Sequence, residues 1–136
     1  MDDCIFCRIV KGEMPCYKVK ETAGTLAFLD IHPVARGHLL VIPKEHIQYY
    51  EDLSAGTAQE LSSVLQSMIQ LLKSKLDFTD YNILFNNGPA SGQIIPHLHA
   101  HIVPRQKDDR VMRFDMGPAR DEKYFKELLA CLKDQA

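Results

Sequence analysis

Three histidines alternate with apolar residues in the last third of the sequence. His97, His99 and His101 are separated by Leu98 and Ala100. Side chains alternate between the two faces of a β-strand, so the three imidazoles are predicted to share one face at intervals of roughly 6.6 Å. A neutral imidazole is nucleophilic near pH 7, and a neighbouring imidazole can be protonated there. The pattern indicates displacement at phosphorus through a covalent intermediate, with the middle residue, His99, as the candidate nucleophile.

A second interpretation of the same residues is a metal-dependent hydrolase. Alternating histidines on a strand can bind zinc and activate a water molecule. The sequence around the three histidines offers no nearby carboxylate to act as the base. A third interpretation, three incidental surface histidines, is disfavoured because three imidazoles on one strand face make a poor core.

The segment before the histidines is rich in turn-forming residues. Gly88 and Gly92 lie in a loop whose backbone N–H groups could surround phosphate oxygens, although an Asn-Gly-Pro sequence is also an ordinary turn. Pro96 has no backbone N–H, so we expect it where the strand starts.

Cysteines are few and unevenly placed. Cys4 and Cys7 have the two-residue spacing of half a zinc site. Cys16 has no evident partner, and Cys131, beside the apolar face of the last predicted helix, is expected in the core. In a reducing compartment, four cysteines do not indicate a disulfide framework.

The composition is that of a globular protein. The chain has 136 residues, 46% apolar and 25% charged, with a net charge of −2. This length indicates one domain over residues 1–136 with a substantial core. The charge and the lack of a basic patch argue against a nucleic-acid partner. No apolar run approaches the roughly 18 residues of a membrane span, and the acidic start lacks a signal-peptide pattern, so a cytoplasmic location is expected.

Hydrophobic periodicity predicts the elements that position these residues. Strands are expected over residues 17–20, 25–29, 38–42, 81–85 and 98–103. Asp3 is predicted to cap a short helix ending at Val10, Ser54 a long helix, and Asp121 a last helix. The predicted apolar face of the long helix comprises Leu61, Val64, Leu65, Met68, Leu72 and Leu76, and that of the last helix Phe125, Leu128, Leu129 and Leu132. Grouped strands and helices favour an α+β fold with an antiparallel sheet.

The residues from His97 to Val103 resemble the signature of the histidine triad family, in which three histidines alternate with apolar residues. The resemblance extends to Gly92-Gln93, to Pro104-Arg105, and to segments 4–15, 26–33 and 36–46. It implies hydrolysis or transfer at the α-phosphorus of nucleotides. It also implies a five-stranded antiparallel sheet with one long and one C-terminal helix, joined into a ten-stranded sheet across a homodimer.

The resemblance assigns roles to four histidines. It implies that His99 is the nucleophile and that His101 contacts the scissile phosphate and assists the leaving group. The backbone carbonyl of His97 would orient the ring of His99. His38 matches a family histidine near this relay, although it could also be an ordinary buried strand residue.

The resemblance further implies a purine nucleotide as the bound partner. Asp30 would accept hydrogen bonds from the ribose hydroxyls, although it could instead cap a turn. Ile94 stands where several members carry a serine or threonine able to contact phosphate, so that contact is absent here. Phe28 and Ile31 would line the base pocket, and Asn86, Gly92 and Gln93 would surround the phosphate.

Many microbial relatives with an N-terminal Cys-x-x-Cys pair hold a zinc ion. By resemblance, one structural Zn²⁺ per chain would be bound by Cys4, Cys7, His46 and His97. The substrate stays open at this stage. An adenosine 5'-monophosphoramidase-like activity is favoured, while the Pro104-Arg105 ending resembles the fragile histidine triad branch and dinucleoside polyphosphate hydrolysis. A non-catalytic nucleotide-binding regulatory protein is the remaining alternative.

Overall fold

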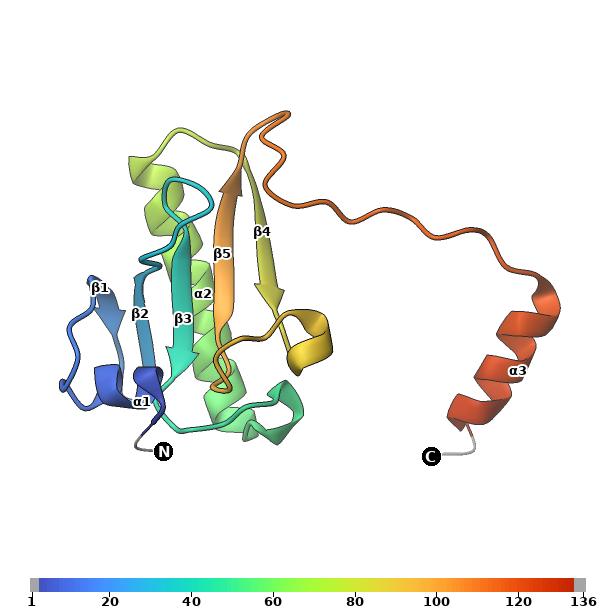
Figure 1. Ribbon diagram of the computed structural model, residues 1–136, viewed down its shortest axis with the longest axis horizontal. Helices are drawn as coiled ribbons and strands as arrows, with labels where there is room; N and C mark the ends of the chain where they lie inside the picture. The colour runs from blue at the N-terminus through green and yellow to red at the C-terminus, as the bar shows by residue number, and fades with distance from the viewer. Residues whose placement is uncertain (1–2, 134–136) are drawn as a thin grey trace.

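The five strands form one antiparallel sheet in the computed structural model, which describes residues 3–133 (Figure 1). The strand order is β1-β2-β3-β5-β4. The predicted α+β class and five-stranded sheet are therefore confirmed. The strands are β1 (Lys18–Glu21), β2 (Thr25–Leu29), β3 (Leu39–Pro43), β4 (Asp80–Phe85) and β5 (Ala100–Arg105), and the α-helices are α1 (Ile5–Val10), α2 (Ala55–Lys75) and α3 (Glu122–Lys133).

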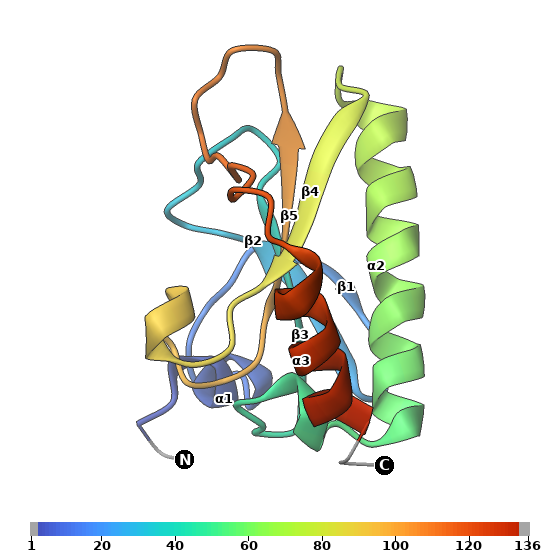
Figure 2. The ribbon, with the colours of Figure 1, turned by 90° about the vertical axis from the view of Figure 1, so that its right-hand side faces the viewer.

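Alternation along β3 divides the core into two clusters. Leu39 and Val41 are fully buried on the face that α2 covers. Leu40 and Ile42 are buried on the other face, where α1 packs (Figure 2). Each such side chain stabilises the fold by roughly 1.5–3 kcal/mol. His101 pairs with Leu40 in the sheet register, so its side chain lies on the α1 face.

Helix α2 follows its sequence pattern closely. The Ser54 side chain accepts a hydrogen bond from the Thr57 N–H at 3.2 Å, which confirms the predicted cap. The predicted apolar face is buried against the sheet as far as Leu72. Leu76 lies just past the end of the helix and packs on the same cluster.

The last strand begins two residues later than predicted. The His97 N–H donates to the Ile95 carbonyl, and the Leu98 N–H donates to the Ile47 carbonyl. Neither residue therefore joins the ladder, which starts where Ala100 pairs with Val41. His97 and His99 stand on the approach to β5, and only His101 lies within the strand.

The first helix has a different cap from the one predicted. Its N-cap is Cys4, whose sulfur accepts from the Cys7 N–H at 3.3 Å, so the assignment to Asp3 was wrong. Strands β1 and β3 each begin one residue later than expected.

Helix α3 stands apart from the sheet, beyond the β4 edge (Figure 1). Asp121 caps it as predicted, accepting from the Tyr124 N–H at 2.9 Å. Its side chains are exposed throughout the part that the structure describes, so placing Cys131 in the core was wrong. Within residues 3–133, no helix combines the length and apolar character needed to cross a membrane.

Candidate functional site

A cavity of about 440 Å³ lies on the α1 face of the sheet, at the end where β5 begins. A volume of this size suits a small-molecule ligand. It is surrounded by α1 with the residues after it, the end of β2 with its following turn, and the segment that runs from the end of β4 into β5, and Leu40 of β3 also lines it. Its lining residues include Ile5, Phe6, Ile9, Met14, Pro15, Cys16, Phe28, Asp30, Ile31, Asn86, Gly92, Ile94, His99 and His101.

One end of the cavity is apolar. Phe28 and Ile31, predicted for the base pocket, both line it, and Ile31 remains 66% exposed at its rim. The sequence did not predict the opposite wall, which α1 supplies through Ile5, Phe6 and Ile9. A helix of six residues is too short for its periodicity to reveal which face is buried. Apolar walls of this kind suit the apolar part of a small-molecule ligand.

His99 has one ring nitrogen fixed and the other free. Its Nδ1 lies 2.7 Å from the His97 carbonyl oxygen, which can only accept, so Nδ1 carries the proton. Nε2 therefore has the lone pair on a ring that lines the cavity. The Phe6 ring packs against this imidazole, with the centroids 5.1 Å apart. Burial lowers the pKa of His99, which favours the neutral, nucleophilic form.

His38 and His101 form a chain of oriented hydrogen bonds. The Val34 N–H donates to His38 Nδ1 at 3.1 Å, so the proton of the neutral ring lies on Nε2. That Nε2–H donates to His101 Nδ1 at 2.9 Å, which leaves the His101 proton on its Nε2. Burial, with added effects from His99 and His38, lowers the pKa of His101 to about 4. At neutral pH, His101 is thus an uncharged donor beside the cavity.

Asp30 stabilises a turn and also lines the cavity. Its Oδ1 accepts from the His32 N–H at 2.8 Å, which stabilises the turn after β2. Its Oδ2 lies 3.3 Å from His38 Nε2, and the carboxylate lines the cavity. A carboxylate can accept about four hydrogen bonds, so capacity remains for a ligand hydroxyl.

The loop between β4 and β5 brings Asn86 and Gly92 to the cavity but turns the Gln93 side chain away. Gln93 is buried, its Oε1 accepts from the Gly88 N–H at 2.7 Å, and its Nε2 donates to the Gln48 carbonyl at 3.3 Å. Gly92 has a φ of 105°, which L side chains rarely adopt. The Gln93 side chain therefore holds the loop through its contacts with Gly88 and Gln48 and does not line the cavity. The contact with Gln48 could not be predicted from sequence spacing.

Cys4, Cys7, His46 and His97 meet on the other side of α1. Their sulfur and Nδ1 atoms all lie within 4.8 Å of one another. Zinc bonds of about 2.3 Å to sulfur and 2.1 Å to nitrogen, at tetrahedral angles, separate those ligands by about 3.6 Å. Cys4 Sγ lies 3.3 Å from His97 Nδ1, and Cys7 Sγ lies 3.2 Å from His46 Nδ1 and 3.6 Å from His97 Nδ1. The donor set and its spacing fit a zinc ion.

The surroundings of His97 prepare it for a metal. Its Nε2 lies 2.8 Å from the Pro43 carbonyl oxygen, so Nε2 carries the proton and Nδ1 presents a lone pair to the cysteines. Such an outer hydrogen bond is typical of metal-ligating histidines. The ring of His97 faces the cysteines while its carbonyl orients His99, so the two roles predicted for His97 are compatible.

In a second group of potential metal ligands, one histidine presents an N–H instead of a lone pair. Asp30, His38 and His101 also have donor atoms within 4.8 Å of one another. However, the Val34 N–H occupies the lone pair of His38 Nδ1, which keeps a proton on Nε2, the atom that would have to bind the metal. This group is arranged as a hydrogen-bonded chain rather than as a metal site.

Comparisons with known proteins agree with this geometry. A model of the HIT domain matches residues 11–108. The adenosine 5'-monophosphoramidase hnt1 of Schizosaccharomyces pombe is 42% identical over 106 residues, which cover 78% of this chain and 77% of that protein.

Solved structures share the whole arrangement. A HIT family protein from Bacillus anthracis superposes with a TM-score of 0.90 at 32% identity, covering 99% of this chain and 98% of that one. Residues 106–133 are 28 of the 136, so a superposition that left them out could not score above about 0.79. At least part of this C-terminal segment is therefore superposed as well. A zinc-bound histidine triad family protein from Mycobacterium smegmatis has a TM-score of 0.75 at 34% identity, covering 99% of both chains.

Proposed function

The chain belongs to the histidine triad family, and from the site that it builds on this fold we propose that it hydrolyses nucleoside phosphoramidates at the α-phosphorus, with His99 as the nucleophile. The orientation of the His99 ring carries this proposal. With Nδ1–H committed to the His97 carbonyl, the lone pair of Nε2 is available at the cavity. The S. pombe relative is named as an adenosine 5'-monophosphoramidase, which supports this substrate class.

The nucleotide would lie along the cavity with its base at the apolar end. Phe28 and Ile31 would contact the base, and Asp30 would accept from the ribose hydroxyls. Asn86 and the backbone at Gly92 would lie next to the phosphate, while Gln93 would act indirectly by holding the loop. Charge-assisted hydrogen bonds to the ribose are the stronger kind, so Asp30 would contribute most of the sugar recognition.

The reaction would proceed in two displacements. In the first, His99 Nε2 forms a bond to phosphorus, the phosphorus–nitrogen bond to the amine breaks, and the amine leaves with a proton from the medium, delivered through His101. In the second, water attacks phosphorus, the bond to His99 breaks, and the proton of the water returns to the medium. The positive charge that develops on the His99 ring is stabilised by the His97 carbonyl, 2.7 Å from Nδ1.

We propose that Cys4, Cys7, His46 and His97 hold one structural zinc ion. When bound, zinc would tie the N-terminal segment to the start of β5 and stabilise the fold. The same connection would fix α1, and with it Phe6, which packs against the ring of His99. The metal would thus support one wall of the cavity without touching the substrate.

A rapid-quench experiment tests the function. The protein is mixed with adenosine 5'-phosphoramidate, quenched in alkali, and its intact mass is measured. We expect one adenylyl group per chain, located at His99 by peptide sequencing. If the protein binds AMP but turns over no amide, ester or polyphosphate of adenosine, the non-catalytic alternative is correct. Faster turnover of dinucleoside polyphosphates than of amides would favour the other hydrolase branch.

His99→Asn is the sharpest variant for this experiment. Its side-chain amide can still donate to the His97 carbonyl, but no nucleophile remains at the position of Nε2. We expect turnover to fall more than about 10³-fold, no adenylylated protein, and AMP affinity within a few-fold of the unaltered chain. Turnover near that of the unaltered chain would exclude His99 as the nucleophile.

A further inference from the structure

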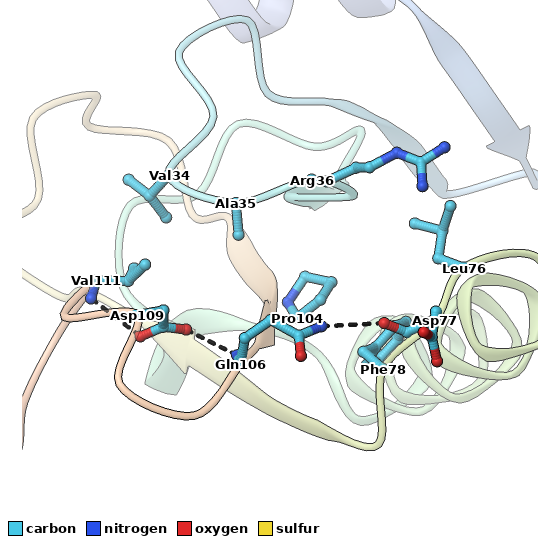
Figure 3. Close-up of a pocket in the computed structure, with 10 residues that line it drawn as sticks. All are labelled: Val34, Ala35, Arg36, Leu76, Asp77, Phe78, Pro104, Gln106, Asp109 and Val111. Atoms are coloured by element: carbon cyan, nitrogen blue, oxygen red, sulfur yellow. Dashed lines mark hydrogen bonds between the residues drawn. The ribbon is translucent and has the colours of Figure 1, made fainter.

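The loop that joins β2 to β3, residues 30–38, lies between the cavity of the candidate site and a second cavity. On the first side, Asp30 lines the candidate site. The second cavity, of about 320 Å³, is lined on the loop side by Val34, Ala35 and Arg36 (Figure 3). Across it lie the connection from α2 to β4 and the end of β5. A shift of the loop toward the second cavity would therefore also move residues of the candidate site.

Gly37 holds this loop close to the end of α2. Its φ is 89°, in the region that L side chains rarely adopt. A methyl group added at Gly37 would lie 2.7 Å from Leu76 Cδ1 and 3.3 Å from Pro104 Cγ. Leu76 packs on the core cluster beneath α2 and lines the second cavity together with Arg36. The close contact between Gly37 and Leu76 therefore sets how far the loop stands from the body of the protein.

The same loop fixes the tautomer of His38. The His38 ring is buried, and its carbonyl accepts from the Asp30 N–H at 3.1 Å, so the sheet holds this residue in place. The Val34 N–H, on the other side of Gly37 in the chain, donates to His38 Nδ1 at 3.1 Å. A displacement of Val34 by about 1 Å would stretch this contact beyond the range of a hydrogen bond. The proton of His38 would then no longer be confined to Nε2, and His101 Nδ1 would lose its donor for part of the time.

We propose that Gly37 and Leu76 are positioning residues for the pair of His38 and His101. Their contact holds Val34 where its N–H keeps the proton of His38 on Nε2, and this proton orients His101 as a donor beside the cavity. Neither Gly37 nor Leu76 lines that cavity, so both act through His38. The consequence for catalysis rests on the proposed function, in which the leaving amine receives its proton through His101.

Gly37→Ala tests the contact from the side of the loop. The added methyl group must displace either the loop or Leu76. We expect a second tautomer of His38 in ¹⁵N spectra of the ring nitrogens, recorded on zinc-loaded protein without substrate. We also expect kcat for adenosine 5'-phosphoramidate to fall more than about 10-fold, because an oriented proton donor is lost.

Gly12→Ala is the matched control. Gly12 also has a positive φ, 79°, but a methyl group added there would have no atom within 4 Å. This variant carries a similar backbone cost without the steric contact. The tautomer of His38 and the turnover should therefore be those of the unaltered chain.

Leu76→Val tests the contact from the other side and provides a rescue. Valine lacks Cδ1, and a β-branched residue suits the extended backbone of Leu76, with φ −118° and ψ 154°. By itself, this change should speed hydrogen exchange of the Val34 amide by more than about 3-fold. Combined with Gly37→Ala, it should restore the single tautomer of His38 and bring kcat to within about 3-fold of that of the unaltered chain.

Three results would overturn the proposal. One is a Gly37→Ala protein with an unchanged His38 tautomer, and another is a double variant in which the losses add instead of cancelling. The third, unchanged Val34 exchange in Leu76→Val, decides the matter even if Gly37→Ala does not fold. The tautomer and the exchange rate are measured without substrate. An unaltered chain that turned over no phosphoramidate would therefore reject the proposed function, while these two readouts would still decide the role of Gly37 and Leu76.

Discussion

The neutrality of His101 has a measurable consequence for stability. Burial, with contributions from His99 and His38, lowers its pKa from 6.5 to about 4 in the folded chain. Between these values, the unfolded chain binds a proton that the folded chain does not. Lowering the pH must therefore destabilise the fold. The free energy of unfolding is unaffected by this group above about pH 6.5 and decreases as the pH falls from there toward 4.

The size of the effect follows from the two pKa values. At pH 5, the ring is almost fully protonated in the unfolded chain and about one-tenth protonated in the folded chain. Linkage then gives a loss of about 2 kcal/mol in the free energy of unfolding between pH 7.5 and pH 5.

His101→Asn removes this titration while keeping an acceptor. The amide oxygen takes roughly the place of Nδ1 and can accept from His38 Nε2–H. The free energy of unfolding is measured in urea for both proteins at pH 7.5 and pH 5, at the same free zinc concentration. Proton binding by the zinc ligands is common to both proteins and cancels in the difference. We expect the unaltered chain to lose about 2 kcal/mol more than the variant. Equal losses, within about 0.5 kcal/mol, would refute the assignment of a neutral, oriented His101.

Three further predictions concern the ligand, the metal and the loop. Asp30→Asn keeps an oxygen for the His32 N–H, so it should weaken AMP by about 1–2 kcal/mol while barely affecting 2′,3′-dideoxy-AMP in calorimetry; equal losses would exclude ribose recognition. Cys7→Ser should abolish zinc binding in elemental analysis. At a free zinc concentration 100 times Kd, it should lower the free energy of unfolding by roughly 2.7 kcal/mol while leaving the rate of the chemical step in the folded protein unchanged. Unchanged stability would exclude a structural metal. Ile94→Ser exposes no core, since Ile94 is 91% exposed, and should raise kcat/KM for the phosphoramidate by about 2–10-fold through one added hydrogen bond; a decrease would show that the apolar side chain contacts the substrate.

The boundaries of the elements were predictable only where local chemistry sets them. Ser54 caps α2 because the bond from the Thr57 N–H is made three residues away. The start of β5 was not predictable from its own residues. There the Leu98 N–H finds its acceptor at Ile47, a residue of a distant loop, so β-strand geometry begins only at Ala100.

The uncovered face of α3 was predictable as apolar but not as exposed. Periodicity shows which residues of a helix avoid water, and it is silent about which molecule provides the cover. The direction in which the chain leaves β5 toward α3 depends on the ion pair between Arg105 and Asp109. This pair and the backbone N–H groups that donate to Asp109 come together only in the folded chain.

The sequence by itself determined the fold class, the family, and the residue types that meet at the two centres. The alternation around His99 and the spacing of Cys4 and Cys7 are local features, so they could be interpreted without coordinates. Only the tertiary structure decided which nitrogen each imidazole presents. A neutral imidazole carries its proton on either nitrogen at nearly equal cost, and the choice is made by the partner of the other nitrogen. For His99, His97 and His38, those partners are a nearby carbonyl, the distant carbonyl of Pro43 and the N–H of Val34. They leave a lone pair at the cavity on the first ring, a lone pair facing the cysteines on the second and an N–H donor on the third.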